Sequence, residues 1–242
     1  MSEAVSTKRG KARVRDLVRC AHPKQAVLLA VAVAVAADLA GRPTREFLLA
    51  GAAVLTVQLS LGMSNDLSDL KHDYRAQTPR KPLAEATIAP STVSYWMLVL
   101  VLVSVPLAFY SGSVAAISLL ITIPVGWVHN RWLHRTALSF VGWVVSGALY
   151  PAFLAYGGWG GGKHGSAPTI AMTGAAAAIG LCLHLATSLG DLVADNKAGA
   201  RDLPLRIALR IGAPRLLYVT VVVSAVSAAC LVVAGLTVGL RQ

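Results

Sequence analysis

The sequence predicts an all-α integral membrane protein, a bundle of about seven transmembrane helices, and three observations support this. Of its 242 residues, 55% are hydrophobic and only 14% are charged, and the mean hydropathy is +0.62. The hydrophobic residues fall in runs of roughly 20, which is the length that crosses the hydrocarbon core of a bilayer as a helix. Glycine, proline and serine interrupt these runs. We expect one transmembrane domain, residues 25–242, after a basic cytoplasmic segment, residues 1–24.

The predicted helices follow one another between short polar or glycine-rich breaks. Pro23 fits the first turn of the first helix, where its missing N–H costs nothing. Residues 41–43 separate the first helix from the second, residues 111–113 the third from the fourth, and the glycine run 157–162 the fifth from the sixth. The first segment is short and the fourth is only marginally long. The seven segments cover approximately residues 25–40, 46–64, 91–110, 113–129, 138–156, 167–188 and 214–239.

The basic residues predict the orientation of this bundle. Eighteen of the 22 Lys and Arg residues lie in the N-terminal segment and in the connections after the second, fourth and sixth helices. The positive-inside rule therefore places the N-terminus in the cytoplasm and, with seven helices, the C-terminus outside. Attraction to anionic lipid explains much of the net charge of +11. The basic tail lacks interleaved aromatic residues, so we expect membrane lipid and not nucleic acid as its partner.

Acidic residues are scarce and clustered, since six of the eleven Asp and Glu residues fall in two runs. The first run holds Asp66, Asp69 and Asp73, and the second holds Asp191, Asp195 and Asp202. In a helix, positions i, i+3 and i+7 share one face, as do i and i+4. The like charges on such a face repel each other unless cations neutralise them. Mg²⁺ suits this arrangement, because one or two carboxylates bind it while phosphates and waters complete its octahedron.

The Mg²⁺ prediction has an open alternative. In that alternative, the acids are solvated loop residues that balance nearby Lys and Arg. On the magnesium interpretation, both runs lie on the cytoplasmic side and together hold the ions that bind a diphosphate. The predicted metal ligands are Asp66, Asp69, Asp73, Asp191 and Asp195.

The acidic runs and their flanks resemble the UbiA superfamily of intramembrane prenyltransferases. Residues 65–73 read NDLSDLKHD and are similar to the first aspartate motif of that family, and residues 78–83 read TPRKPL, like its basic segment. Residues 191–195 read DLVAD and, with the NKAGARDLP that follows, are similar to the second motif. Both motifs follow the helices that carry them in the family, the second and the sixth. A basic loop at residues 129–135 also has a counterpart, and the similarity covers roughly residues 19–240.

The sequence also departs from the family pattern. The family usually has nine helices, whereas this sequence predicts seven, without counterparts of the last two. Asp202 stands where the family usually has Thr or Ser. A smaller bundle could need a partner chain to close its cavity, and oligomeric state is left open. His184, about two turns before Asp191, is interpreted as a core histidine.

The resemblance implies a membrane prenyltransferase that uses Mg²⁺. The donor would be a polyprenyl diphosphate, and the acceptor a lipophilic molecule, most commonly aromatic in this family. The residues expected to bind the diphosphate substrate are Asn65, Lys71, Arg80, Lys81 and Lys197. Two alternatives stay open. A UbiA-type terpene cyclase would ionise the same donor without an external acceptor, and a non-catalytic transport or assembly protein would use the acids to bind cations or lipid headgroups.

Overall fold

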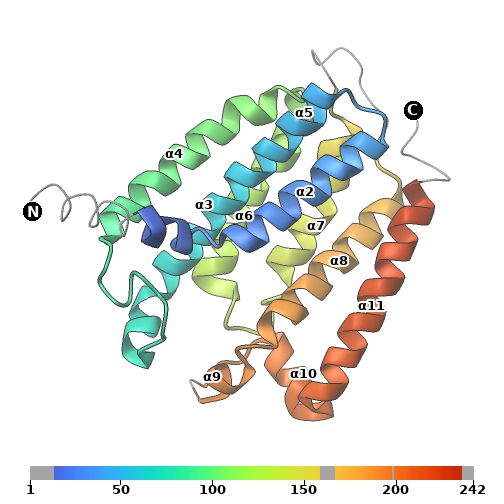
Figure 1. The fold of residues 1–242 in the computed structure, drawn as a ribbon. Helices are drawn as coiled ribbons and strands as arrows, with labels where there is room; N and C mark the ends of the chain where they lie inside the picture. Colours follow the sequence, from blue (N-terminus) through green and yellow to red (C-terminus); the bar gives the residue numbers. More distant parts are fainter. Residues whose placement is uncertain (1–13, 159–166, 198, 236–242) are drawn as a thin grey trace, which may run out of the picture.

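The computed structural model describes residues 14–158, 167–197 and 199–235, which form helices that lie alongside one another (Figure 1). This part of the chain contains no β-strand. Each predicted apolar segment is helical where the structure describes it, which confirms the all-α fold. Residues 236–239 of the seventh segment lie outside the described residues. The helices that correspond to the seven segments are α2 (Pro23–Leu39), α3 (Thr44–Ala76), α4 (Pro90–Phe109), α5 (Ser113–Leu120) with α6 (Thr122–Val128), α7 (Val141–Ala155), α8 (Ile170–Ser188) and α11 (Ala213–Ala234).

The number of membrane spans is close to the prediction. Among the described residues, five helices are long and apolar enough to cross a membrane. A sixth is added if the helix Val14–Cys20 and α2, which meet at a bend of 62°, count as one span. The fifth segment, α7, is apolar but has only 15 residues, fewer than the roughly 20 that a straight span needs. The protein is therefore a multi-pass integral membrane protein, with five or six spans among the described residues.

The fourth span is continuous but irregular. α5 and α6 meet at Ile121, and α6 runs directly into a π-helical turn, η1 (His129–Leu133). π-helical turns are rare and often occur at functional sites. This turn belongs to the basic loop at residues 129–135 and lies at the same end of the bundle as the acidic runs (Figure 1).

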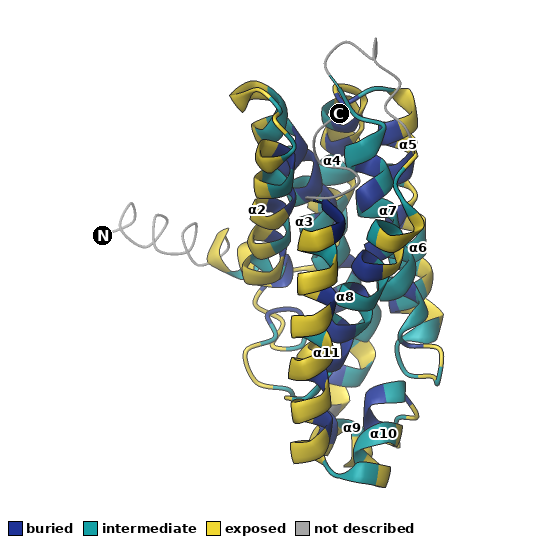
Figure 2. Ribbon diagram, turned by 90° about the vertical axis from the view of Figure 1, so that its right-hand side faces the viewer, coloured by how far each residue is buried: buried dark blue, intermediate teal, exposed yellow. Residues whose placement is uncertain are grey.

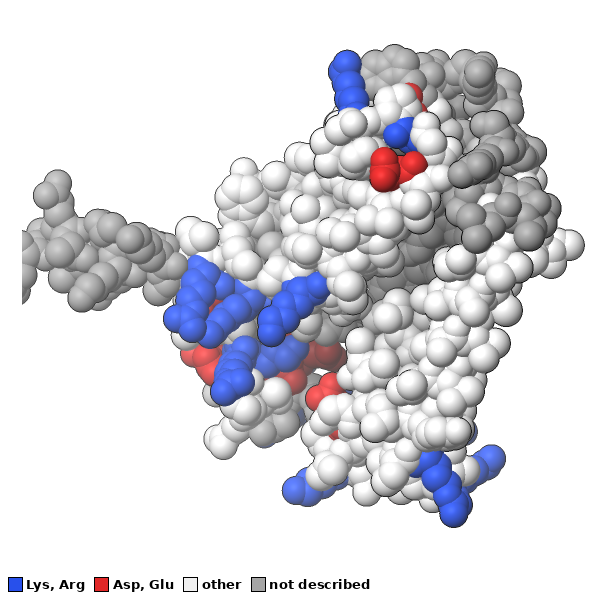
Figure 3. Space-filling view, turned by 45° about the vertical axis from the view of Figure 1, so that its right-hand side comes forward, with Lys and Arg blue, Asp and Glu red and all other residues white. Residues whose placement is uncertain are grey.

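Neighbouring helices pack closely against one another, and their outer sides are apolar and exposed. α2 packs on α3, α3 on α4, α7 on α8, and α8 on α11. Only 17% of the apolar window of α4 and of α11 is buried, and Figure 2 shows the exposed outer side of α11. Figure 3 shows Lys and Arg gathered beside Asp and Glu at one end of the molecule, below a broad uncharged band. The exposed apolar sides and this uncharged band fit a lipid environment.

The length of α3 brings the first acidic run out of the membrane core. Its 33 residues make a helix of about 50 Å, whereas the hydrocarbon core is about 30 Å thick. If Thr44 marks one edge of that core, the other edge lies about 20 residues later, near Ser64. The remaining turns hold the acidic run beyond the hydrocarbon. The helix ends where Gln77 takes a left-handed conformation (φ 51°), two residues before Pro79.

Two short helices shape the connection that carries the second acidic run. α8 ends at Ser188, α9 covers Leu192–Lys197 and α10 covers Leu203–Ile211. Asp202 caps α10, because its carboxylate accepts a hydrogen bond of 2.9 Å from the backbone N–H of Leu205. Buried leucines of α8, α9, α10 and α11 then form one apolar cluster. The connection is therefore anchored at both ends and in its middle.

Candidate active site

Hydrogen bonds tie the connection after α8 to the loop that follows η1. The backbone N–H of Arg201 donates to the carbonyl oxygen of Arg135 at 3.2 Å. The hydroxyl of the fully buried Ser139 accepts from the backbone N–H of Leu203 at 3.1 Å, and it lies 2.9 Å from Nε2 of His184. The prediction that His184 is a satisfied core histidine is thus confirmed. These contacts hold the second acidic run against the basic loop.

The same basic loop is also held against α3, which carries the first acidic run. The buried amide of Asn130 donates to the carbonyl oxygen of Leu61 at 3.2 Å. Nε2 of His134 lies 3.1 Å from Oδ1 of Asp69, although the two atoms lack hydrogen-bond alignment. The two acidic runs, more than 100 residues apart in sequence, therefore lie at the same end of the bundle with the basic loop in contact with both.

The three aspartates of the first run do not all point the same way. Successive residues turn by about 100° around a helix, so Asp66 and Asp73 are about 20° apart while Asp69 is turned about 40–60° from them. Asp66 is 3% exposed, and its Oδ1 lies 2.6 Å from Nζ of Lys81 and 2.8 Å from Nε2 of His22. Nζ of Lys81 is also 3.7 Å from Asp73. Asp66 and Asp73 thus share a cation of the protein itself.

The electrostatics of Lys81 follow from this pairing. Burial disfavours its ammonium group, but the nearby carboxylates, Asp66 above all, outweigh that effect and raise the pKa of Lys81 above its ordinary value. Lys81 therefore stays charged at neutral pH. The sequence predicts that Lys81 binds the substrate. In this structure, however, its ammonium group is paired with Asp66 and Asp73.

Asp69 faces a small basic pocket. Nδ2 of Asn65 donates to Oδ2 of Asp69 at 3.2 Å, one turn apart on α3. The pocket has a volume of about 210 Å³ and opens at the end of α3. It is lined by Ser68, Asp69, Lys71, His72, Arg75, His134 and Arg135. Of the first acidic run, only Asp69 lines this pocket, and the other lining residues are polar or basic.

The second acidic run gathers negative charge that the nearby Arg135 offsets only in part. Asp191 is exposed, and its carbonyl oxygen accepts from the backbone N–H of Asp195 at 2.8 Å, so the two residues lie one helical turn apart. Burial first, and then the charges of Asp202 and Asp191, raise the pKa of Asp195 to about 6. The charge of Asp69 also raises the pKa of Asp195, so the two acidic runs interact electrostatically at this end of the bundle. A bound cation would relieve this repulsion.

Some of the predicted substrate ligands are not gathered at this site. Arg80 is exposed with a left-handed backbone (φ 65°), and its backbone N–H donates to Oε1 of Glu85 at 2.8 Å. The Lys197 side chain is exposed and has no partner among the described residues. Within the same part of the chain, no three His, Cys, Asp or Glu side chains are close enough together to hold a metal ion alone. The carboxylate and amide oxygens nevertheless match the ligands that Mg²⁺ prefers.

The sequence did not single out several residues that the structure brings to the site. His134 and Arg135 come from the basic loop, Arg75 from the last turn of α3, and His22 from the turn before α2. The sequence did show that basic residues gather at 129–135. That pattern indicated the segment, but it did not indicate which side chains reach the site. Contact between that loop and Asp69 depends on how η1 packs on α3.

Comparison with known proteins places this geometry in context. The sequence model of the UbiA prenyltransferase family matches residues 26–241. None of the curated protein sequences matches the chain. Among solved structures, a UbiA homolog from Archaeoglobus fulgidus bound to GPP and Mg²⁺ is similar over 91% of this chain and 78% of its own, with 18% identity and a TM-score of 0.68. The same homolog bound to DMAPP and Mg²⁺ has a TM-score of 0.67.

A third solved structure, described as digeranylgeranylglyceryl phosphate synthase, shares 15% identity with a TM-score of 0.60. It is similar over 90% of this chain and 76% of its own length. At these identities the structural matches establish a common fold, and the family match covers nearly the whole sequence. The chain is therefore a multi-pass membrane protein that belongs to the UbiA prenyltransferase family.

Proposed function

We propose that this protein is a Mg²⁺-dependent membrane prenyltransferase that moves a prenyl group from a prenyl diphosphate to a lipophilic acceptor. The observation that carries the proposal is that the basic loop contacts Asp69 through His134 and the second acidic run through Arg135, which brings both runs to one end of the bundle beside a basic pocket. Family membership and solved relatives bound to GPP, DMAPP and Mg²⁺ support it. The site then lies where the headgroup of a membrane-embedded donor would reach the protein surface.

The proposed magnesium ligands are Asp66, Asp69, Asp73, Asp191 and Asp195, and the structure divides them into two groups. Asp69, Asp191 and Asp195 have carboxylates without a bound lysine, and Asn65 supplies an amide oxygen next to Asp69. Asp66 and Asp73 would bind Mg²⁺ only if the ammonium group of Lys81 moves away from them. Bound Mg²⁺ would stabilise the diphosphate as a leaving group through its Lewis acidity.

The residues of this chain would assist the departure of pyrophosphate. Lys71, Arg75 and Arg135 line the basic pocket and can donate charge-assisted hydrogen bonds to phosphate oxygens. Lys197 is exposed on α9 and Arg80 in the turn after α3, so either would have to swing inward to contact the diphosphate. Preorganised positive charge of this kind lowers the barrier because it stabilises charge that develops as the bond breaks.

The reaction balances without a further reactant. The bond between the first prenyl carbon and the diphosphate oxygen breaks, and its electron pair leaves with pyrophosphate. A nucleophilic carbon or oxygen of the acceptor forms the new bond to that prenyl carbon and then loses a proton to solvent. The apolar walls of the helices would keep water from the allylic cation. We propose an aromatic or other lipophilic acceptor from the membrane, with the site on its cytoplasmic side.

Pyrophosphate release tests the proposal. The purified protein is incubated with Mg²⁺, extracted membrane lipids and a series of prenyl diphosphates of increasing chain length, and released pyrophosphate is measured. Asp69→Asn and Asp195→Asn should each lower the rate about a hundredfold or more, because each removes charge that holds the leaving group. Asp38→Asn is the matched control, since Asp38 is an exposed aspartate near the end of α2, outside both acidic runs.

Mass spectrometry of the products separates the candidate reactions. A prenylated acceptor supports the transferase, and a hydrocarbon or alcohol formed without acceptor supports a cyclase. If no donor yields pyrophosphate, or if the Asp69 and Asp195 variants turn over as fast as the Asp38 variant, the aspartates do not serve this chemistry. A non-catalytic cation-binding role would then be the better interpretation.

A further inference from the structure

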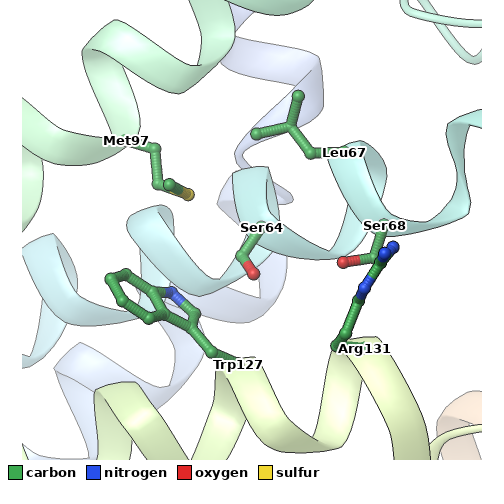
Figure 4. Close-up of a pocket in the computed structure, with 6 residues that line it drawn as sticks. All are labelled: Ser64, Leu67, Ser68, Met97, Trp127 and Arg131. Atoms are coloured by element: carbon green, nitrogen blue, oxygen red, sulfur yellow. The ribbon is translucent and has the colours of Figure 1, made fainter.

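A second cavity lies across α3 from Lys81 and its two aspartates. It has a volume of about 280 Å³ and opens between α3, α4 and the α6–η1 segment (Figure 4). Its lining residues are Ser64, Leu67, Ser68, Met97, Trp127 and Arg131. None of them is acidic. On α3 these positions are turned about 100–160° from Asp66, away from the ion-paired side of the helix. Ser68 also lines the basic pocket beside Asp69, so the two cavities are neighbours.

Polar residues spaced one turn apart on two facing helical segments line this cavity. Ser64 and Ser68 are one turn apart on α3, and Trp127 and Arg131 are one turn apart on the α6–η1 segment. The bond from Asn130 to the α3 backbone fixes the distance between the two segments. Met97 and Leu67 form an apolar wall on the α4 side.

All the polar groups in this cavity can donate hydrogen bonds, and they lack protein partners. Ser60 and Ser118, elsewhere in the bundle, donate to carbonyl oxygens of their own helices at 2.7 and 2.9 Å. Ser64 and Ser68 make no such bond within the described chain. Nε1 of Trp127 is buried and has no acceptor there either.

The charge in the cavity is also uncompensated. The guanidinium of Arg131 has no carboxylate or other partner among the described residues. Figure 4 shows it beside the hydroxyl of Ser68, with the indole nitrogen of Trp127 turned toward Ser64. Nε1 of Trp127 is a buried donor without an acceptor, which costs free energy, and the two hydroxyls and the exposed guanidinium of Arg131 lie around the same cavity. Together these donors point to an anionic ligand that accepts from them.

The position of the cavity in the membrane identifies the class of ligand. With one edge of the hydrocarbon core set at Thr44, the other edge lies near Ser64, which would place the cavity at the level of the lipid headgroups. The neighbours of Met97 on α4, Trp96 and Leu98, are 43% and 51% exposed and would face lipid. Cationic pockets between helices at this level are suited to anionic headgroups.

We propose that this cavity is a binding site for the phosphate headgroup of an anionic membrane lipid. Arg131 and Ser68 bind the phosphate oxygens, Trp127 and Ser64 donate to the remaining acceptors, and the upper part of an acyl chain packs on Met97 and Leu67. A zwitterionic headgroup binds less well, since no lining carboxylate is available for its cation. The site does not depend on the proposed prenyltransferase activity.

Lipid titration tests this site. The full chain, purified free of lipid in detergent, is titrated with dioctanoyl phosphatidylglycerol, dioctanoyl phosphatidylcholine or inorganic phosphate, and binding is measured by calorimetry and by the rise in thermal midpoint. We expect phosphatidylglycerol to bind at least tenfold more tightly than either comparison ligand. Arg131→Gln should weaken that binding roughly ten- to a hundredfold, as expected for loss of a charged hydrogen-bond donor.

The control is another exposed arginine. Arg215 lies at the start of α11 and outside the cavity, so Arg215→Gln should change the dissociation constant less than twofold. The double variant Ser64→Ala/Ser68→Ala removes two donors with little effect on packing and should also weaken binding. Trp127→Phe keeps a ring but removes the N–H.

The outcomes separate the sources of the anion. Equal affinity for phosphatidylglycerol and phosphatidylcholine would overturn the proposal, and so would equal losses in the Arg131 and Arg215 variants. If inorganic phosphate binds as tightly as phosphatidylglycerol, the apolar wall contributes nothing and the lipid assignment is wrong. Weaker binding in the serine double variant supports the site even if Arg131→Gln lowers the yield of folded protein.

Discussion

Replacing Lys81 with methionine tests the ion-paired side of α3. In the structure, Nζ of Lys81 lies 2.6 Å from Asp66, which is 3% exposed, and 3.7 Å from Asp73. Lys81→Met keeps the aliphatic stem but leaves the Asp66 carboxylate with Nε2 of His22, at 2.8 Å, as its remaining side-chain partner. An aspartate so deeply buried cannot recover its lost partner from water.

The magnitude follows from the burial of the pair. Breaking a buried ion pair by removing one partner costs about 3–5 kcal/mol. The Lys81 side chain is 24% exposed and His22 still contacts Asp66, so we expect about 2–3 kcal/mol here. For a domain of this size, that corresponds to a fall of about 4–12 °C in the thermal midpoint.

The assay is thermal unfolding in detergent at one fixed scan rate, because membrane proteins often unfold irreversibly and the midpoint then depends on the rate. Lys71→Met is the matched control, since Lys71 is exposed and has no partner among the described residues, and it should shift the midpoint by less than about 2 °C. The double variant Asp66→Asn/Lys81→Met should recover much of the loss, because it removes the unpaired charge.

Two results would refute this reasoning. One is a midpoint of Lys81→Met that stays within the range of the Lys71 control. The other is a double variant as unstable as Lys81→Met alone, which would mean that the methionine disturbs packing and not charge. In the first case, Lys81 would be free to contact the substrate, as its sequence position predicts.

Two further predictions follow from the helix contacts and from the second acidic run. Gly180→Ala would place a methyl group against the carbonyl oxygen of Trp143 on α7 and should lower the thermal midpoint by several degrees, whereas Gly174→Ala on the same helix meets nothing within 4 Å and should raise it slightly. Because the pKa of Asp195 is raised to about 6, Mg²⁺ affinity measured by calorimetry should fall as the pH drops from 7 through 6 to 5, when protons compete for the carboxylate. Asp195→Asn should flatten that dependence, and an unchanged pH profile in the variant would show that another group titrates.

The fold followed from local properties of the sequence. Runs of about 20 apolar residues predict helices wherever they occur, because only a helix satisfies its own backbone hydrogen bonds in lipid. The structure confirmed each of the seven segments as helical and extended the second from about residue 64 to Ala76. Hydropathy could not find that extension, since its residues are polar and their helical conformation continues from the apolar part. It also could not show that α7 has only 15 residues.

The chemistry of the candidate site was only partly visible in the sequence. Clustering of scarce acids marked both acidic runs, because like charges are rarely gathered without a purpose near a membrane. Spacing placed Asp66, Asp69 and Asp73 on one broad side of α3, but it could not assign partners. Lys81 reaches Asp66 only because the chain reverses after Gln77, and His134 reaches Asp69 only because η1 packs on α3.

The sequence by itself determined the class of protein: a helical membrane bundle of the UbiA type with two acidic runs at one end. These features depend on hydropathy, charge and short motifs, which act within one or two turns of helix. The tertiary structure decided which carboxylates are bound by the protein's own cations and which remain for a metal ion. It also decided that four hydrogen-bond donors from α3 and the α6–η1 segment surround one cavity. Such contacts join residues from 15 to 69 positions apart, and only the packing of the chain sets their distances.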